Sequence, residues 1–416
     1  MDVDAEYRRM VSTASSAREV AIIGAGPAGL FAAEIIASAG HRVTIYERMP
    51  SPARKFLLAG RGGLNLTHSE HLEDFVTRYG DGNGRVQASV EAFPPSRLVA
   101  WANDLGAETF VGTSGRVFPK AMKASPLLRA WLRRLDSLGV VIRTRHRWKG
   151  FEEGNSLLFD TPAGDVTVKP AACLFALGGA SWPRLGSDGS WVGPFEQAGI
   201  KSTKLLPANC GVIIPWSEIF KSRFAGHALK RIAITVGGMT ARGEAIITEA
   251  GLEGGAIYSV GPSIRAALAA DGEATLMLDL KPDLDGPALT ARLQTRRPKE
   301  TLTNFLRKAA HLSPAAVALL REGSTPLPET AEDLAARVKA VAVRVVGLTS
   351  IERAISTAGG LSWATLDEHM MIASMPGMFA AGEMLDWEAP TGGYLLQASF
   401  ATGAAAGRGV LKWLGR

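Results

Sequence analysis

A short apolar run followed by three spaced glycines constrains the fold of this chain more than any other feature. Residues 20–23 are apolar, and the segment IIGAGPAGL places Gly24, Gly26 and Gly29 in a GxGxxG arrangement. In such a turn the first glycine allows a tight bend, the second lets the backbone approach a pyrophosphate, and the third lets the next helix pack closely on the strands. The sequence therefore predicts a strand, a phosphate-binding turn and a helix in succession.

The residues after this turn complete a βαβ unit. We expect a helix over residues 28–38 and a second strand over residues 42–46, which together open a doubly wound α/β sheet. Glu47, at the end of the second strand, would accept hydrogen bonds from adenosine ribose hydroxyls, and the N-terminus of the helix would hold the phosphates. The pattern favours dinucleotide binding over a glycine-rich packing turn, and at this point both FAD and NAD are open.

Two later segments favour FAD. Residues 174–179 (LFALGG) and 379–383 (FAAGE) each form an apolar run that ends in glycine, and the second ends in Glu383. An NAD domain needs no return of the distant part of the chain to the site, whereas FAD has a ribityl chain whose hydroxyls an acid such as Glu383 can bind. The segment TGGYLLQ after residue 390 would direct a helix N-terminus at the flavin pyrimidine edge. No covalent attachment residue stands out, so we expect non-covalent FAD.

Length and composition indicate a globular protein of two or three domains. The chain has 416 residues, of which 46% are hydrophobic and 21% charged. Residues 205–279 contain short alternating apolar runs typical of strands, at 232–236, 245–248 and 275–279, and residues 287–345 have a helical composition. We therefore expect a β domain and a small helical insert between two halves of the dinucleotide-binding domain.

The most basic stretch of the chain begins with a predicted helix over residues 125–138, for which Ser125 would be the N-cap and Pro126 the first helical residue. Residues 140–148 alternate apolar and basic residues and predict one strand. The basic residues of this stretch are Arg129, Arg133, Arg134, Arg143, Arg145 and Arg147. No aromatic ladder accompanies them, so we interpret them as a solvated or partner-contacting face, and nucleic acid is not the expected partner.

Other features exclude several classes of protein. The two cysteines, Cys173 and Cys210, match no metal-ligand or dithiol spacing, so we expect no metal and no disulfide scaffold. Residues 1–17 lack the apolar core of an export signal, and we expect a cytoplasmic protein. Residues 20–40 are apolar enough to span a bilayer, but a strand, turn and helix account for all of them, so we expect no membrane span.

At these residues a family resemblance becomes specific. The chain resembles the BaiN/YhiN-like FAD-dependent (NAD(P)/FAD) oxidoreductases, which include aminoacetone-oxidase-like three-domain flavoproteins. The segments that carry the resemblance occur in the expected order along the whole chain: IIGAGPAGL, KFLLAGRGGLNLTH, GRVFPK, GGASWPRLGSDG, GLEGG, TAGGL and AAGEMLDWEAPTGGYLLQ. The resemblance implies an FAD-binding Rossmann-like domain from residues 1–200 and 361–416, a β-barrel-like substrate domain from 201–285 and 346–360, and a helical insert over 286–345.

The chain departs from the family pattern in loops on the expected substrate side. Leu64 stands where many members have a cysteine, and Leu395 where the usual motif has asparagine. Residues 248–255 also differ from the common THxGxSGP pattern. Thiol-dependent chemistry and the substrate of a relative therefore do not carry over to this chain.

The candidate site residues follow from these motifs. As candidates for catalysis we take the basic, imidazole and phenol side chains of the glycine-rich segments, namely Arg61, His68, Arg116 and Tyr394. The candidates for binding FAD are Gly24, Gly26, Pro27, Ala28, Gly29, Glu47, Arg48, Lys55, Gly62, Gly63, Asn65, Leu66, Thr67, Gly178, Gly179, Trp182, Gly382, Glu383, Gly392, Gly393, Tyr394 and Leu395. Arg116 and Lys120 could also fix a carboxylate or phosphate.

The expected function is hydride exchange between the flavin N5 and a small organic substrate. The electron partner is open, because the sequence contains no second GxGxxG turn that would bind NAD(P)H stably. The alternatives are transiently bound NAD(P)H, oxygen or another carrier. An FAD-containing RNA-binding or RNA-modifying protein, with residues 129–149 as its footprint, is the alternative. A redox sensor whose FAD does not turn over is a third reading without specific support, and the oligomeric state is open.

Overall fold

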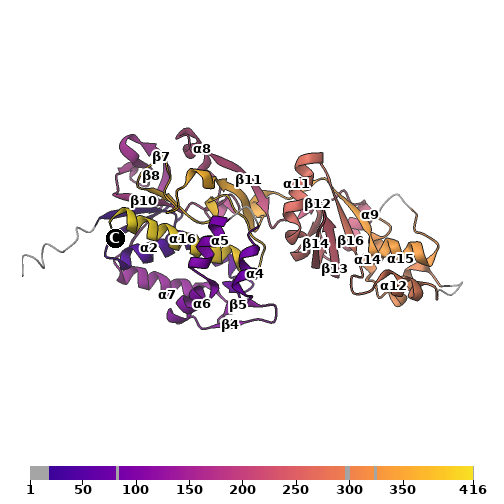
Figure 1. Ribbon diagram of the computed structural model, residues 1–416. Helices are drawn as coiled ribbons and strands as arrows, with labels where there is room; N and C mark the ends of the chain where they lie inside the picture. Colours follow the sequence, from indigo (N-terminus) through magenta and orange to yellow (C-terminus); the bar gives the residue numbers. More distant parts are fainter. Residues whose placement is uncertain (1–17, 81–83, 296–299, 323–325, 416) are drawn as a thin grey trace, which may run out of the picture. The chain divides into compact units, whose positions relative to one another are not determined.

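A computed structural model describes residues 18–80, 84–295, 300–322 and 326–415. The chain forms two compact units, one from Met1–Leu206 with Thr357–Arg416 and one from Pro207–Ser356 (Figure 1). The expectation about an export signal in residues 1–17 lies outside the described residues. Within the described ranges, no helix has both the length and the apolar character needed to cross a bilayer.

The first unit contains a five-stranded parallel sheet to which both ends of the chain contribute. Its strand order is β20 (Met378–Ala380), β10 (Ala172–Phe175), β1 (Glu19–Ile23), β2 (Arg42–Glu47) and β6 (Val141–Thr144). The buried strands β1 and β10 are almost continuously apolar, as expected for parallel strands covered on both faces. The predicted Rossmann-type parallel α/β sheet is confirmed.

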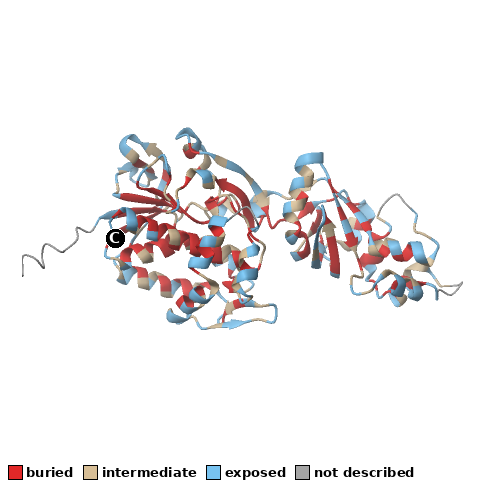
Figure 2. Cartoon of the chain, in the orientation of Figure 1, coloured by how far each residue is buried: buried red, intermediate tan, exposed pale blue. Residues whose placement is uncertain are grey.

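Two helices with small residues at their contact pack against each other beside this sheet. Helix α2 (Pro27–Ser38) follows β1, and α16 (Tyr394–Trp413) comes from the other end of the chain. A Cβ atom on Gly403 of α16 would lie 2.5 Å from the backbone oxygen of Ala28, so only glycine allows this approach. Figure 2 shows both helices buried along much of their length. The Gly/Ala-rich ending of the sequence is therefore the contact surface for the helix of the first βαβ unit.

The remaining elements of the first unit are short. Its other helices are α3 (Arg54–Ala59), α4 (Leu72–Thr77), α5 (Gly84–Ala92), α6 (Pro95–Asp104), α7 (Ala124–Ser137) and α8 (Val192–Gln197). Two three-stranded antiparallel sheets are formed by β3 (Thr67–His68), β5 (Arg116–Pro119) and β4 (Thr109–Val111), and by β7 (Arg147–Glu152), β8 (Ser156–Thr161) and β9 (Gly164–Val168). Strand β11 (Ser202–Ala208) pairs with β19 (Ser356–Leu361).

Two local predictions were wrong in this unit. Helix α7 begins at Ala124 with Lys123 as its N-cap residue, so Ser125 lies inside the first turn and caps nothing. Residues 140–148 do not form one strand, because Arg145 adopts a left-handed conformation with φ 59°. The turn at Arg145 sends β6 into the parallel sheet and β7 into a separate antiparallel sheet, a change of partner that an alternating sequence cannot reveal.

The second unit is built on a seven-stranded antiparallel sheet. Its strand order is β17 (Val341–Val345), β16 (Ala274–Asp279), β13 (Ala228–Val236), β14 (Met239–Ile247), β15 (Gly251–Glu253), β12 (Val212–Ile213) and β18 (Gly347–Leu348). The two edge strands, β17 and β18, are consecutive parts of one stretch of chain. Both edges of the sheet therefore belong to one stretch of the chain, and a β-barrel-like substrate domain stays a prediction.

The helices of the second unit share one hydrophobic core with its sheet. They are α9 (Glu218–Phe224), α10 (Gly255–Ser259), α11 (Gly261–Asp271), α12 (Gly286–Leu293), α13 (Leu302–Ala309), α14 (Pro314–Leu319) and α15 (Ala331–Lys339). Leu289, Leu306 and Leu334 of these helices pack in the same cluster as Leu276 of β16. A helical domain of its own stays a prediction. The helical reading was wrong for Val341–Val345, whose alternate residues are buried as one edge of the sheet.

Candidate functional site

A pocket opens in the first unit at the carboxyl ends of β1, β2 and β10, which is where open α/β sheets bind their ligands. The chain segment that follows β20 also reaches it, through Gly382 and Glu383. The predicted cofactor-binding residues that line it are Gly24, Gly26, Pro27, Ala28, Glu47, Arg48, Lys55, Gly178, Gly382 and Glu383. The structure thus brings the glycine turn and the distant FAAGE segment to one cavity.

The three glycines of the turn have different surroundings. Gly24 has φ +104°, and a Cβ atom there would lie 2.3 Å from the backbone oxygen of Ala176, so glycine is required by the fold. A Cβ atom on Gly29 would lie 2.1 Å from the oxygen of Gly24, which reflects the close helix–strand packing expected of it. Around Gly26, by contrast, a Cβ atom would meet nothing within 4 Å. The space beside Gly26 adjoins the N-terminus of α2, which has no side-chain cap, and is therefore suited to a phosphate.

Glu47 is held by the turn itself. Its Oε2 accepts a hydrogen bond from the backbone N–H of Ala25 at 2.9 Å, and its Oε1 accepts one from Met49 at 2.8 Å. Burial raises the pKa of Glu47, and the two backbone hydrogen bonds act in the opposite direction. A carboxylate can accept about four hydrogen bonds, so two acceptor positions are left for a ligand.

Several polar side-chain atoms of the pocket are buried and have no hydrogen-bond partner among the described residues. One is Nε of Arg48, a predicted cofactor-binding residue. The others, which the sequence did not single out, are Nε of Arg54, the indole nitrogen of Trp148 and the hydroxyl of Ser187. Arg48 uses its guanidinium Nη1 in an ion pair with Asp188. Buried polar groups are satisfied in nearly all native proteins, so these four atoms point to a polar ligand in the pocket.

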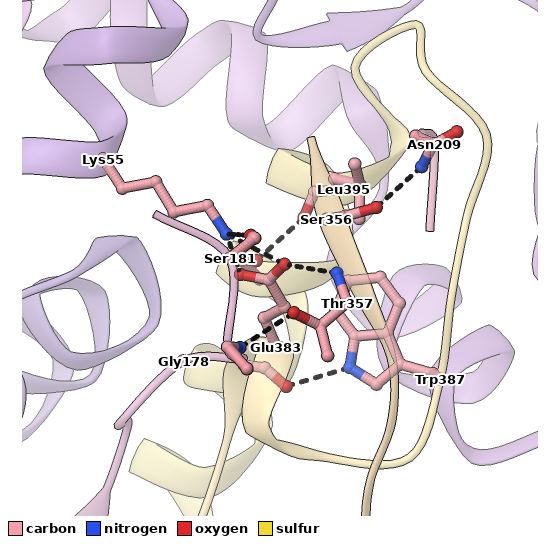
Figure 3. A network of polar contacts seen from close by, with 12 residues as sticks. Lys55, Gly178, Ser181, Asn209, Ser356, Thr357, Glu383, Trp387 and Leu395 are labelled. Atoms are coloured by element: carbon pink, nitrogen blue, oxygen red, sulfur yellow. Dashed lines mark hydrogen bonds and ion pairs between the residues drawn. The ribbon is translucent and has the colours of Figure 1, made fainter. Parts of the chain in front are cut away.

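Lys55 and Glu383 form the centre of a polar network (Figure 3). The Nζ atom of Lys55 donates to Glu383 Oε2 at 2.7 Å and to Ser181 Oγ at 2.6 Å. Glu383 Oε1 also accepts from the backbone N–H of Thr357 at 3.1 Å. The side chains of the pair are only 26% and 15% exposed, respectively. This network fixes a lysine and a carboxylate at the wall of the pocket, far from Glu47 in sequence.

A second group of predicted residues lies at the N-terminus of α16. Gly393 has φ +100°, and a Cβ atom on it would lie within 2.5 to 2.7 Å of three backbone atoms of Thr67. The hydroxyl of Thr67, a residue with 0% exposure, and Oδ1 of Asn65 have no hydrogen-bond partner among the described residues. Ser399 of α16 lines the pocket, and the start of the helix at Tyr394 is about 7.5 Å away along its axis at 1.5 Å per residue.

Tyr394 and His68 are brought together at this helix terminus. Their rings stack with centroids 5.6 Å apart and an interplanar angle of 19°. The Tyr394 hydroxyl donates a hydrogen bond to Glu70 Oε1 at 2.6 Å, and Arg78 pairs with the same carboxylate. Glu70 and Arg78 were not predicted as site residues. The available signal was the position of Glu70, two residues after the predicted His68.

Other predicted residues lie apart from the pocket lining. Arg61, Gly62 and Arg116 are exposed, and Trp182 and Leu395 are partly buried. Lys120 is exposed and pairs with Glu108. Gly63, Leu66, Gly179 and Gly392 do not line the pocket either, although a Cβ on Gly179 would meet the Thr357 side chain at 2.3 Å, beside the Lys55–Glu383 network.

Among the described residues, no group of three or more His, Cys, Asp or Glu side chains could hold a metal ion.

The basic stretch is mostly solvent-exposed. Arg129, Arg133, Arg143, Arg145 and Arg147 are exposed. Arg134 is not part of this face, because it pairs with Glu34 and Asp104 within the first unit. Arg145 and Arg147 line a second, open groove together with Arg48 and Asp188 of the main pocket.

The parallel sheet, the uncapped helix after a GxGxxG turn and the acid at the end of β2 define a dinucleotide-binding protein of the Rossmann class. FAD fits the residues present, since unpartnered polar atoms lie in the pocket and the unpartnered hydroxyl belongs to Thr67, which lies against the start of α16. The chain belongs to the HI0933-like family, because the model of the HI0933-like protein Rossmann domain matches residues 18–409.

Two curated relatives match nearly the whole chain. A 3-dehydro-bile acid delta(4,6)-reductase of Clostridium scindens is 24% identical over 409 residues, covering 94% of this chain and 98% of the relative. A ribosomal RNA dihydrouridine synthase of Escherichia coli is 24% identical over 405 residues, covering 94% and 97%. These matches confirm the predicted resemblance to the BaiN/YhiN-like family, and the chain is an enzyme of the FAD-dependent oxidoreductase class.

Solved structures share the fold. A 3-ketosteroid delta1-dehydrogenase of Sterolibacterium denitrificans has a TM-score of 0.53 and 12% identity, covering 95% of this chain and 99% of that one. A flavocytochrome c3 fumarate reductase has a TM-score of 0.52 and 15% identity, covering 100% and 82%. At these identities the likeness concerns the fold alone.

Proposed function

We propose that this protein binds one FAD non-covalently and reduces a carbon–carbon double bond of a small organic substrate. The observation that carries the proposal is the single pocket lined by both the GxGxxG turn and Glu383 from the distant end of the chain. When bound, FAD would supply the hydride at its N5 atom. The protein's own residues would bind and orient the cofactor, exclude water and balance charge.

The binding roles follow from the contacts. The N-terminus of α2 and the free space at Gly26 would receive the pyrophosphate, and Glu47 would accept hydrogen bonds from the adenosine ribose. Arg48 and Ser187 offer unpartnered polar atoms in the same cavity. The Lys55–Glu383 pair would bind the ribityl hydroxyls, because a carboxylate fixed by a lysine keeps its remaining acceptor positions in place.

The reacting end of the cofactor would lie at the start of α16. The partial positive charge of this 20-residue helix's N-terminus would stabilise negative charge on the reduced pyrimidine ring. The unpartnered hydroxyl of Thr67 and amide oxygen of Asn65 would hydrogen-bond to the ring edge. Both glycines before Tyr394 have positive φ, 133° and 100°, which keeps bulky side chains away from this position.

The type of reaction, and not the particular substrate, is inferred from the relatives. Both of their names denote hydrogen addition to a ring double bond, in a bile acid and in a uridine of ribosomal RNA. We infer a cyclic or planar enone-type substrate for this chain, and NAD(P)H is the first electron donor to test. Oxygen and other carriers are the alternatives.

The test begins with the purified protein. It should be yellow and should release one FAD per chain on denaturation. Under anaerobic conditions, NADH or NADPH should bleach the flavin, and a cyclic enone from a substrate panel should restore its colour, whereas a saturated ketone of the same ring size should not. A protein that binds no FAD would overturn the proposal, and one whose flavin is reoxidised by no enone would overturn the substrate class.

RNA is the second candidate substrate, favoured by one relative and by the exposed arginines beside the pocket. Binding through these residues should be steeply salt-dependent. The triple change of Arg143, Arg145 and Arg147 to glutamine should then weaken RNA binding by at least tenfold. The same change of three exposed arginines of the other unit, Arg292, Arg321 and Arg353, serves as the charge-matched control. Equal affinity of both variants for a structured RNA would exclude this footprint.

A further inference from the structure

Glu70 lies at the centre of a polar cluster that the proposed function does not use. Its side chain is 15% exposed and forms two hydrogen bonds with Arg78, from Nε to Oε1 at 3.2 Å and from Nη2 to Oε2 at 2.7 Å. Oε1 also accepts the hydroxyl hydrogen of Tyr394 at 2.6 Å. Two bonds to a guanidinium fix a carboxylate in one orientation, so the phenol is fixed with it.

The rest of Tyr394 is held from two other sides. Its backbone oxygen accepts a hydrogen bond from the hydroxyl of Tyr79 at 2.9 Å, and its ring packs on Phe75 at a centroid distance of 4.7 Å. Both residues belong to the α4 region that also carries Arg78. A side chain held at its ring, its hydroxyl and its backbone has little freedom to move when a ligand binds.

Glu70 also fixes the imidazole that stacks on Tyr394. The backbone N–H of Glu70 donates to His68 Nδ1 at 3.1 Å, so Nδ1 is the unprotonated nitrogen and Nε2 carries the hydrogen. Nε2 then donates to the backbone oxygen of Ser114 at 2.9 Å. Both ring nitrogens are therefore engaged, and these two contacts fix the orientation of the imidazole.

The charges in the cluster keep the phenol protonated. Burial raises the pKa of Tyr394, and its hydrogen bond to the Glu70 carboxylate raises it further. Burial alone would raise the pKa of Glu70, but the hydrogen bonds from Arg78 and Tyr394 outweigh it and lower that pKa. Arg78, His68 and Tyr79 are the other titratable groups that face Tyr394. A tyrosinate here would sit at the N-terminus of α16 and would neutralise its partial positive charge.

We propose that Glu70 is a positioning residue of the active site, which holds Tyr394 neutral and stacked on His68 so that the N-terminus of α16 stays free to stabilise a reduced flavin. The inference rests on the proposed function for the identity of the ligand. The carboxylate acts through Tyr394 and not on the substrate. Replacing it by a neutral side chain should therefore create a new ionisation of Tyr394 at alkaline pH.

The first experiment measures tyrosinate absorbance against pH in the purified protein. In Glu70→Gln, Tyr394 should ionise at a clearly lower pH than in the native protein, because the carboxylate no longer raises the pKa of the phenol while burial still does. This signal should vanish in Glu70→Gln/Tyr394→Phe. Glu70→Asp keeps the charge and should suppress the ionisation as the native residue does. Glu73→Gln, at an exposed acid of α4 three positions after Glu70, is the matched control and should behave as the unmodified protein.

The second experiment measures the rate of flavin reduction against pH. Glu70→Gln should lose at least tenfold in rate as Tyr394 ionises, and the double variant should not show this alkaline loss. If Glu70→Gln and Glu70→Asp differ from the native protein only in thermal stability, with no Tyr394-dependent ionisation, Glu70 is structural and the inference is wrong. The tyrosinate readout needs no flavin, so failure of FAD binding would remove the proposed function without imitating either outcome.

Discussion

Gly26→Ala should separate ligand binding from folding more cleanly than any other change in the glycine turn. Gly26 has φ −84° and ψ 179°, which alanine adopts without strain, and its added Cβ would meet nothing within 4 Å. The free energy of unfolding of the apoprotein should therefore stay unchanged or rise by about 0.4–1 kcal/mol. The same methyl group would fill the space beside the N-terminus of α2, where we place the pyrophosphate.

The expected loss of FAD affinity can be sized from the bonds at stake. Pushing the pyrophosphate away would lengthen two backbone hydrogen bonds to a charged group, each worth about 1.5–3 kcal/mol. A loss of about 3 kcal/mol corresponds to roughly a hundredfold weaker binding at 1.4 kcal/mol per factor of ten. Titration of apoprotein with FAD, followed by flavin fluorescence, measures the affinity, and thermal unfolding without FAD measures the fold.

Gly24→Ala is the contrasting variant. Its Cβ would lie 2.3 Å from a backbone oxygen at a residue with φ +104°, so it should destabilise the apoprotein itself. Gly193→Ala, where a Cβ also meets nothing within 4 Å and which lies outside the pocket, controls for the added methyl group. If Gly26→Ala binds FAD as tightly as the native protein, or unfolds as early as Gly24→Ala, the assignment of this space to the cofactor is refuted.

Three further changes test other parts of the account. Lys55→Met leaves the Glu383 carboxylate without its cation, which should weaken FAD binding at least tenfold in the same titration. Because solvent partly screens this pair, the free energy of unfolding should fall by only about 1–2 kcal/mol. Glu34→Ala removes the acceptor of two indole N–H groups and Arg134, so urea unfolding should show a loss of about 3 kcal/mol with unchanged FAD affinity; a large affinity loss would contradict a purely structural role. The pKa of Glu70 is lowered in the folded protein, so the stability that its carboxylate contributes is present above the unfolded pKa of about 4.3 and is lost as the pH falls through the folded pKa. The difference in the free energy of unfolding between the native protein and Glu70→Gln should therefore shrink below pH ~4, and a difference that grows in acid would be incompatible with this pKa direction.

The local sequence was sufficient wherever chemistry and backbone geometry coincide. The GxGxxG turn predicted the first strand, the helix and the second strand, because a glycine with positive φ and a close helix–strand contact leave few alternatives. The FAAGE segment predicted a return of the chain to the same site, and Glu383 lines the same pocket as Glu47.

What the sequence could not reveal depends on contacts between distant segments. The Lys55–Ser181 hydrogen bond joins residues 126 positions apart, and nothing in the local pattern of Ser181 signals it. The turn at Arg145 and the strand at Val341–Val345 were missed for a related reason, since sheet partners override local alternation and composition. Ser187, in a loop, and Trp148, in β7, were missed because segments far from the glycine turn in the sequence bring them to the pocket.

The most direct measurement of the central claim is a crystal structure of the protein saturated with FAD. We expect continuous density for one cofactor, with the adenosine ribose in hydrogen-bond contact with Glu47, the pyrophosphate beside Gly26 and the ribityl chain at Glu383. The isoalloxazine should then lie at the N-terminus of α16, beside Thr67. Density that leaves either Glu47 or Glu383 without contact to the cofactor would contradict it.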